Sequence, residues 1–321
     1  MIIRNSATIF NALGGIMNVY KPAGVSVRKV INAIITNLCK DLNQLETRKP
    51  RSRLLFDKVD NETYNLEVVP DPADDIKVVG ERHQFSDFKC QPAVSLGHFT
   101  SGVLLLGINR GTRTAYHIRM NRPVRVYRVT GRFGKATETH MFDSRIIAKS
   151  DFGHVSRGKL SGFLSSLQAS HQRKMFELCG VDIQSETAYN LATQGTIRPA
   201  NNNLPVIYGI SLVDFKRPYF TLEIHALNEY EDYLATLIHE IGLGLQTVAH
   251  CTALRCIRCG YFTVDDSLLR GNWNLQHVIS NLQVSSKILE DHPDITNQES
   301  ISLVNSDTKE ELFSATNLIE K

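Results

Sequence analysis

Closely spaced positive charges near the middle of the chain are well suited to bind phosphate groups. No Asp or Glu occurs from residue 88 to residue 137, and eight cationic side chains fall within residues 110–135. They are Arg110, Arg113, Arg119, Arg122, Arg125, Arg128, Arg132 and Lys135. Tyr116 and Tyr127 lie among them, and nucleic-acid bases stack on aromatic rings. The run therefore favours a nucleic-acid surface, and the alternative is a solvated basic face without a partner.

A second group of residues has the chemistry of metal ligands. His250 and Cys251 are followed by Cys256 and Cys259, and a Cys-x-x-Cys pair with a nearby His can hold zinc. On a strand, however, residues three apart face opposite sides of the sheet. We therefore expect free buried thiols here and no metal site.

The composition limits the class of protein. A chain of 321 residues with 42% hydrophobic content can form one large domain or two ordinary ones. Its net charge of +3 is mild, and six cysteines in a chain of this size favour a reducing compartment. No apolar run is long enough to span a bilayer, and no secretory signal is visible.

Local patterns predict the elements that position these residues. Ser26 is a suitable N-cap for an amphipathic helix over 27–42. Alternation predicts an exposed hairpin around 64–68 and strands over 124–133 and 219–225. Further helices are expected at 160–167, at 185–195 and at 230–241, the last ended by Gly242. This mixture fits an α+β domain.

Composition also suggests how the chain is divided. Residues 1–17 contain one Arg and no acid, which allows a short mitochondrial targeting segment or an ordinary strand. We expect the main domain to cover 18–285, with a polar insertion near 43–88. Residues 286–321 are polar and poor in aromatics, so we expect a disordered tail there.

The loop at residues 95–107 resembles a known catalytic motif. It reads Ser-Leu-Gly-His-Phe-Thr-Ser-Gly-Val-Leu-Leu-Leu-Gly and is similar to the signature of TruB-type pseudouridine synthases, in which Leu-Asp-Pro-x-Ala-x-Gly-Val-Leu carries an essential Asp. The stretches at 18–24, 125–137 and 237–262 resemble the other family motifs in the expected order. Ser170-His171-Gln172 and Ile197-Arg198-Pro199 resemble the animal mitochondrial branch.

The resemblance implies a fold and a reaction. The family fold is a mixed, mostly antiparallel sheet flanked by helices, with RNA bound in a central cleft. The reaction breaks the C1′–N1 bond of a uridine that has left the helical stack, and rejoins the base through C5. In the family an Asp starts this chemistry, an Arg forms an ion pair with that Asp, and a Tyr that corresponds to Tyr127 stacks on the base.

The Asp and its Arg partner are both missing from the matching positions. Counted back from Gly102, the Asp position is Gly97, and matching Gly97 and His98 to the mitochondrial branch instead implies a deletion of four residues. The Arg position, seven residues before Gly242, is Ala235. Keeping one charge alone would cost roughly 3–5 kcal/mol. His98 is only a weak substitute, because an imidazole lacks the fixed charge and the reach of the carboxylate.

We therefore expect an RNA-binding member of this family with little or no activity. The alternative is an active synthase that uses an unusual residue, or an isoform in which the loop is restored. The residues expected to contact RNA are Tyr127, Lys21, Arg122, Arg125, Arg128 and Arg255. No cofactor is expected. The branch implies a monomer in the mitochondrial matrix, with RNA and RNA-processing or ribosome-assembly factors as its partners.

Overall fold

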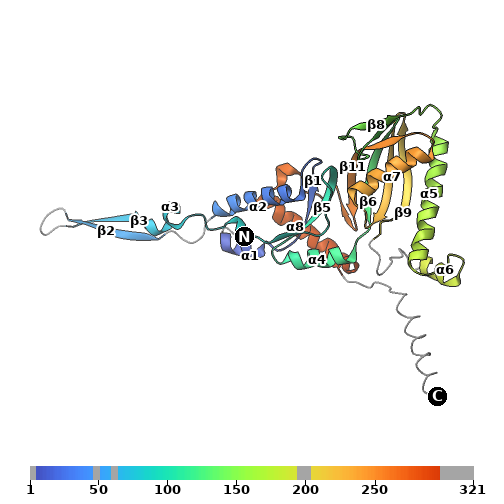
Figure 1. The fold of residues 1–321 in the computed structure, drawn as a ribbon. Helices are drawn as coiled ribbons and strands as arrows, with labels where there is room; N and C mark the ends of the chain where they lie inside the picture. Colours follow the sequence, from blue (N-terminus) through green and yellow to red (C-terminus); the bar gives the residue numbers. More distant parts are fainter. Residues whose placement is uncertain (1–4, 46–50, 59–63, 194–203, 297–321) are drawn as a thin grey trace, which may run out of the picture.

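The computed structural model describes residues 5–45, 51–58, 64–193 and 204–296 (Figure 1). Its helices are α1 (Ser6–Ala12), α2 (Val27–Asn43), α3 (Ile76–Val79), α4 (Gly111–Asn121), α5 (Arg157–Leu178), α6 (Glu186–Thr193), α7 (Glu231–Gly244) and α8 (Leu275–Asp291). Its strands are β1 (Gly15–Lys21), β2 (Ser52–Lys58), β3 (Tyr64–Pro70), β4 (Cys90–Pro92), β5 (Thr100–Ile108), β6 (Arg125–Phe133), β7 (Lys135–Thr137), β8 (Ile146–Lys149), β9 (Val206–Lys216), β10 (Tyr219–Leu227), β11 (Ala249–Cys259) and β12 (Phe262–Thr263).

Eight of the described strands form one mixed sheet. Six of them follow the order β1, β5, β11, β6, β10, β9, while β4 pairs with β5 and β12 pairs with β11. The pairing of β5 with β11 is parallel, and the other pairings in this sheet are antiparallel. The α+β class and the mostly antiparallel sheet expected from the sequence are confirmed.

Helices pack around this sheet (Figure 1). Helix α7 packs on β11, α5 runs along β9, and α8 and α4 pack against β1. Side chains along β6 alternate between the two faces of the sheet. A side chain added to Gly131 would meet Ile238 of α7, so Arg125 and Tyr127, which share its parity, face α7. Arg128 faces the opposite side.

Helix α2 shows how the local signals produce an element. The Ser26 hydroxyl accepts a hydrogen bond from the backbone nitrogen of Lys29 at 3.3 Å, which satisfies one free donor of the first turn. Val30, Ile34 and Leu38 then recur on one face and are buried. The predicted helix is confirmed, with its end one residue later than expected.

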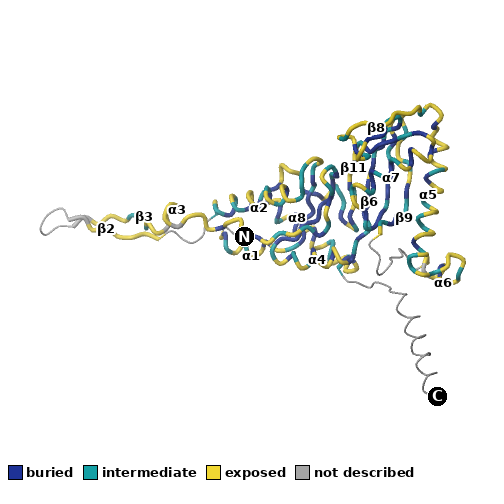
Figure 2. Tube along the Cα trace, viewed as in Figure 1, coloured by how far each residue is buried: buried dark blue, intermediate teal, exposed yellow. Residues whose placement is uncertain are grey.

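The expected hairpin is also present. Strands β2 and β3 pair antiparallel and project away from the rest of the molecule (Figures 1 and 2). Leu54 pairs with Val68 and Phe56 pairs with Leu66, and these four side chains are exposed on one face of the ribbon.

Both expected ends of the main domain need correction. Ile16 and Met17 are buried in β1, so the fold begins before residue 18 and overlaps the expected targeting segment. Helix α8 continues to Asp291 and Ile295 is buried, so the folded part extends beyond residue 285. The first polar residues after 285 belong to the solvent-facing side of α8, which is why composition alone predicts a disordered tail there. Residues 297–321 lie outside the described part of the chain.

No helix among the described residues combines the length and the apolar character needed to cross a membrane.

Candidate active site

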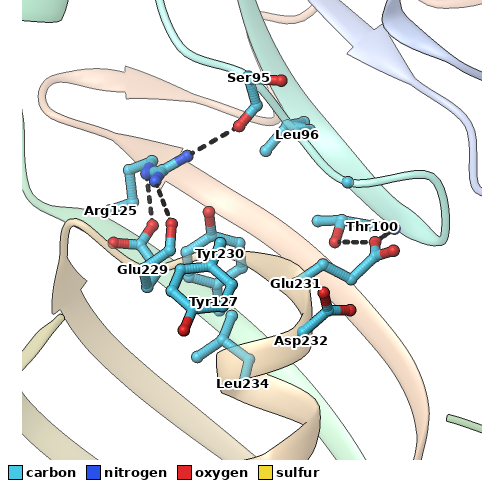
Figure 3. Close-up of a pocket in the computed structure, with 11 residues that line it drawn as sticks. Ser95, Leu96, Thr100, Arg125, Tyr127, Glu229, Tyr230, Glu231, Asp232 and Leu234 are labelled. Carbon is cyan, nitrogen blue, oxygen red and sulfur yellow. Dashed lines mark hydrogen bonds and ion pairs between the residues drawn. The ribbon is translucent and has the colours of Figure 1, made fainter. Parts of the chain in front are cut away.

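A pocket of about 290 Å³ opens between the loop at residues 95–100 and the first turn of α7 (Figure 3). Its volume is at the lower end of the range for small-molecule sites. The lining residues are Ser95, Leu96, Gly97, Thr100, Arg125, Tyr127, Glu229, Tyr230, Glu231, Asp232 and Leu234. The pocket therefore joins the motif loop, strand β6 and the start of α7, three segments that lie far apart in the sequence.

Lys21 anchors the loop at residues 95–100 through hydrogen bonds from its ammonium group. Its side chain is fully buried, and its Nζ donates hydrogen bonds to the carbonyl oxygens of Pro22, His98 and Thr100 at 3.2, 3.0 and 2.7 Å. Burial lowers the pKa of Lys21 to about 8, although the carboxylate of Glu231 opposes this shift. Lys21 was expected to contact RNA, which stays a prediction; its ammonium group fixes the loop through the hydrogen bonds to His98 and Thr100.

Arg125 and Glu229 form a buried ion pair at one side of the pocket (Figure 3). The Arg125 guanidinium also donates to the carbonyl oxygens of Glu229 at 2.8 Å and of Ser95 at 3.2 Å. Burial opposes the charge of Arg125, but the neighbouring Tyr127 and Glu229 hold its pKa above its usual range. Burial raises the pKa of Glu229, and Arg125 opposes that shift. Arg125 was expected to contact RNA as part of the basic run, and that stays a prediction; its guanidinium forms a buried ion pair in the pocket wall.

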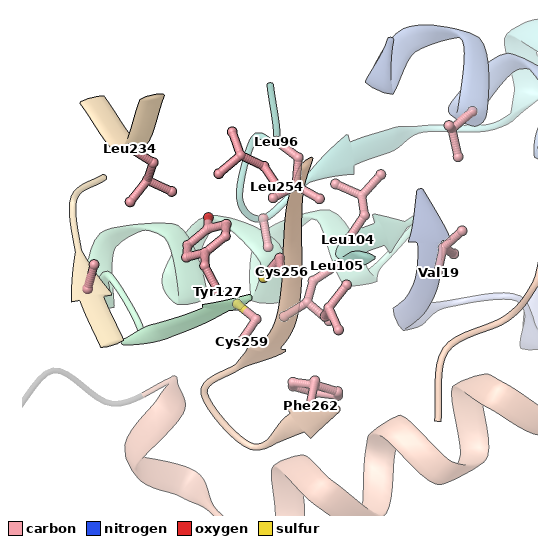
Figure 4. Packing of buried hydrophobic residues seen from close by; sticks show 14 of the residues in the cluster. Val19, Leu96, Leu104, Leu105, Tyr127, Leu234, Leu254, Cys256, Cys259 and Phe262 are labelled. Atoms are coloured by element: carbon pink, nitrogen blue, oxygen red, sulfur yellow. The ribbon is translucent and has the colours of Figure 1, made fainter. Parts of the chain in front are cut away.

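Tyr127 forms part of the pocket wall and of the core. It is 3% exposed and lies between Leu234 of α7 and the thiols of Cys256 and Cys259 on β11 (Figure 4). Burial raises the pKa of Tyr127 well above its usual value, so its hydroxyl is neutral at physiological pH. An aromatic face at the pocket wall suits the stacking of a planar base.

A carboxylate from α7 lies against the loop that carries no acid of its own. The Oε2 atom of Glu231 accepts hydrogen bonds from the backbone nitrogen and the hydroxyl of Thr100, both at 2.6 Å (Figure 3). A Cβ atom added at Gly97 would lie 2.3 Å from both Cδ and Oε2 of Glu231. The sequence indicated that the loop supplies no carboxylate, and the fold brings one to it from 134 residues further on, counted from Gly97 to Glu231.

The remaining catalytic candidates lie outside the pocket lining. His98 is exposed, and its ring packs edge-on against Phe99. Ala235 is fully buried in α7, one helical turn after Glu231. That Gly97 and Ala235 occupy the Asp and Arg positions of the family stays a prediction.

The other arginines expected to contact RNA lie elsewhere. Arg128 and Arg255 are exposed cross-strand partners on β6 and β11, on the face of the sheet opposite to α7. Arg255 stacks over the Tyr20 ring at 5.4 Å, and Arg128 is 3.7 Å from the Glu223 carboxylate. Arg122 caps the end of α4 in a left-handed conformation. The structure thus separates these arginines from the pocket.

The cysteine cluster differs from expectation in its geometry. A register shift between Cys256 and Arg258 interrupts the alternation of β11, and Cys256 and Cys259 both lie beside Tyr127 (Figure 4). The expectation that they face opposite sides is wrong, because a bulge adds one residue between them. Both are free buried thiols, as expected, and burial raises the pKa of Cys259 to about 12. Among the described residues no His, Cys, Asp or Glu cluster is arranged to hold a metal ion.

Sequence reasoning missed Glu229 and Glu231. They lie immediately before and within the first turn of α7, where acidic residues are common because they complement the helix dipole. Acidic residues at this position therefore give no signal of a functional role. The signal that could have revealed Glu229 is the parity of β6, which places Arg125 on the same inward face as Tyr127 and so requires a buried partner for its charge.

Comparison with known proteins gives the family. Residues 91–230 match the model described as the N-terminal domain of the TruB family pseudouridylate synthases. Over 274 residues the chain is 39% identical to "Pseudouridylate synthase TRUB2, mitochondrial" of Xenopus tropicalis, a match that covers 83% of this chain and 84% of that protein. The chain belongs to the TruB family of pseudouridine synthases.

Two further similarities were found. The human protein of the same name is 33% identical over 273 residues, which cover 83% of this chain and 82% of that protein. Among solved structures, "Structure of H/ACA RNP bound to a substrate RNA containing 2'-deoxyuridine" matches with a TM-score of 0.43 and 15% identity. The match covers 92% of this chain and 59% of that chain, so this chain spans less than two thirds of its length.

Replacing Lys21 by Met is expected to lower the free energy of unfolding by about 1–3 kcal/mol, because three carbonyl oxygens around its buried side chain lose their donor. The effect should depend on pH. The folded-state pKa of Lys21 is about 8, against 10.5 for the ordinary group, so the folded state binds this proton less tightly than the unfolded state. Wild type should therefore gain stability relative to Lys21→Met as the pH rises from about 8 towards 10.5. Urea unfolding of both proteins at several pH values measures this, and a constant difference would contradict it.

Proposed function

We propose that this chain binds RNA, receives one unpaired uridine in the pocket at 95–100, and forms pseudouridine slowly or not at all. The observation that carries the proposal is the pocket itself, with the Tyr127 ring in its wall beneath the family's motif loop. The small pocket volume suits a single base. Low activity is proposed because Gly97 brings no carboxylate and Ala235 brings no guanidinium to the family's positions.

The exposed sheet face supports a polyanionic partner. Arg128 and Arg255 are direct cross-strand neighbours, and like charges in that arrangement destabilise a sheet. A phosphate backbone would relieve this repulsion. Arg255 lies over the ring of Tyr20 on β1, and Arg132 on β6 lies over the ring of Tyr219 on β10. We propose that this face binds RNA phosphates by electrostatic attraction.

The site of action is proposed from the relatives. The Xenopus and human proteins are named as mitochondrial, and we propose that this chain also acts in mitochondria, in the matrix. The RNA partners proposed there are messenger or ribosomal RNA. A monomeric state, and an association with RNA-processing or ribosome-assembly factors, belong to the same proposal.

RNA affinity should fall steeply with salt, and charge reversal on the sheet face should weaken it. We expect the double variant Arg128→Glu/Arg255→Glu to bind RNA more weakly at every sequence tested. The slope of log affinity against log salt should decrease by about 0.7 for each single-strand phosphate that the variant no longer neutralises. Fluorescence anisotropy with a labelled stem-loop RNA at several salt concentrations measures both quantities.

The matched control is Arg173→Glu, which reverses an exposed charge on α5. It should leave the affinity and the salt slope unchanged. An affinity that is independent of salt, or equal losses in the control and in the double variant, would show that the sheet face is solvated surface. Arg125 is unsuited to this test because its charge reversal would break a buried ion pair.

A further inference from the structure

We infer that Glu231 supplies the reactive carboxylate of this pocket, from the first turn of α7, in place of the loop residue at position 97. The inference rests on the proposed function, that the pocket receives a uridine. It assigns whatever isomerisation the chain performs to a side chain that lies outside all the motif stretches by which the family is recognised.

The first support is position. An Asp carboxyl carbon lies one bond, about 1.5 Å, from its Cβ, and the Glu231 carboxyl carbon is 2.3 Å from where a Cβ at residue 97 would be. The two carboxyl groups would therefore occupy the same part of the pocket. A longer side chain that starts from the opposite wall reaches the place that Gly97 leaves empty.

The second support is orientation. Both hydrogen bonds from Thr100 go to Oε2 of Glu231, and Thr100 is itself buried. In the described part of the chain the side chain of Glu231 makes no other hydrogen bond, so Oε1 is available to a ligand in the pocket that Glu231 lines. Lys21 is close enough for the charge of Glu231 to influence its pKa, and so provides positive charge beneath the loop. Thr100 and Lys21 thus act as positioning residues for the carboxylate.

The third support is the charge state of the neighbours. Glu229, a fully buried carboxylate of the pocket, forms an ion pair with Arg125, and Asp232 is exposed. Glu231 is the pocket acid that is both oriented by buried donors and next to the loop. It is also the first residue of α7, where the helix dipole stabilises a negative charge.

The chemical step balances without a co-reactant other than water. An oxygen of Glu231 bonds to C1′ of the ribose as the C1′–N1 bond breaks, and the electron pair of that bond moves to the uracil ring. The uracil turns, C5 bonds to C1′, and the bond between Glu231 and C1′ breaks with return of its electron pair to the carboxylate. C5 then loses a proton to water and N1 gains one, so the product is an isomer of the substrate.

The test uses the full chain and a pool of stem-loop RNAs transcribed with randomised loops, so that every loop sequence is offered. RNA retained by the protein is recovered after a long incubation and digested, and its nucleosides are separated by chromatography to quantify pseudouridine. We expect slow formation by wild type and a loss of about 100-fold or more in Glu231→Gln. The Gln amide oxygen can still accept from Thr100, so RNA affinity and melting temperature should stay unchanged. Glu231→Asp should retain part of the activity.

Glu240→Gln is the matched control, because it makes the same chemical change on an exposed residue of the same helix. It should form pseudouridine as fast as wild type. Bound RNA without pseudouridine in the wild-type sample would overturn the inference and leave RNA binding intact. Equal rates for wild type and Glu231→Gln would overturn it as well. Failure to retain any RNA would instead overturn the proposed function on which the inference rests.

Discussion

Replacing Arg125 by Met is expected to lower the free energy of unfolding by about 3–5 kcal/mol, the largest stability effect we predict. The guanidinium neutralises Glu229 inside the protein and donates to two backbone carbonyls. A Met fills similar volume but leaves a carboxylate buried without its partner, which costs far more than the loss of the pair itself. Urea unfolding monitored by circular dichroism measures the change.

Two further variants make this prediction specific. Arg125→Met with Glu229→Gln should recover part of the loss, because no charge then remains buried. Arg128 lies three residues after Arg125 on β6 and forms an exposed ion pair with Glu223 of β10. Arg128→Met breaks that pair and should cost less than about 1 kcal/mol. Similar losses for Arg125→Met and Arg128→Met would show that the Arg125 pair is solvated.

Restoring the acid at the loop by Gly97→Asp alone should destabilise the protein by about 2–4 kcal/mol. The new Cβ would lie 2.3 Å from the Glu231 carboxyl carbon and 2.5 Å from its Cβ, and overpacking of this kind costs about 1–3 kcal/mol. Two carboxylates would also share one small space, so one of them must take up a proton. The cost should therefore decrease as the pH falls, because protonation removes the repulsion.

The compensating change is Glu231→Ala. It removes the obstructing side chain and moves the carboxylate from the helix to the loop. In a double-mutant cycle for unfolding, Gly97→Asp and Glu231→Ala should couple favourably by roughly 0.5–3 kcal/mol. If the two effects simply add, the loop carboxylate does not enter the space that Glu231 occupies, and the shared position inferred for the two groups is wrong.

The structure also changes which second residue belongs with Gly97. The family pattern pointed to Ala235→Arg as the partner of a restored Asp. Ala235 is fully buried, so a guanidinium there would have to displace packed side chains of α7 and the sheet. The residue that contacts the loop is one turn earlier, at 231.

Local sequence signals predicted helices and strands, but they did not predict the contacts between residues that are distant in the sequence. Ser26 and its apolar stripe predicted α2 within one residue of its end, because a cap and a helical period are properties of neighbouring residues. Alternation likewise predicted β6 and the β2–β3 hairpin. Each of these signals is contained in a window shorter than 20 residues.

The site depends on contacts that no such window contains. The family motif predicted that Tyr127 lies in the pocket. The charge pattern predicted only that Arg125 belongs to a basic run. The ion pair with Glu229 joins residues 104 positions apart, and the Glu231 contact with Thr100 joins residues 131 apart. Only the sheet order, which inserts β11 between β5 and β6, brings the motif loop, β6 and α7 to one place.

That sheet order also determines when the sheet can be completed during synthesis. Strand β11 is central in the sheet, yet it leaves the ribosome after all the other strands of the six-strand path. Until residues 249–259 are available, the inner edges of β5 and β6 are unpaired, and unpaired edges invite association with other chains. At ordinary translation rates the delay between β6 and β11 is on the order of 10 s. The nascent chain therefore has two half-sheets that need protection, and a chain truncated before β11 has no means of joining them.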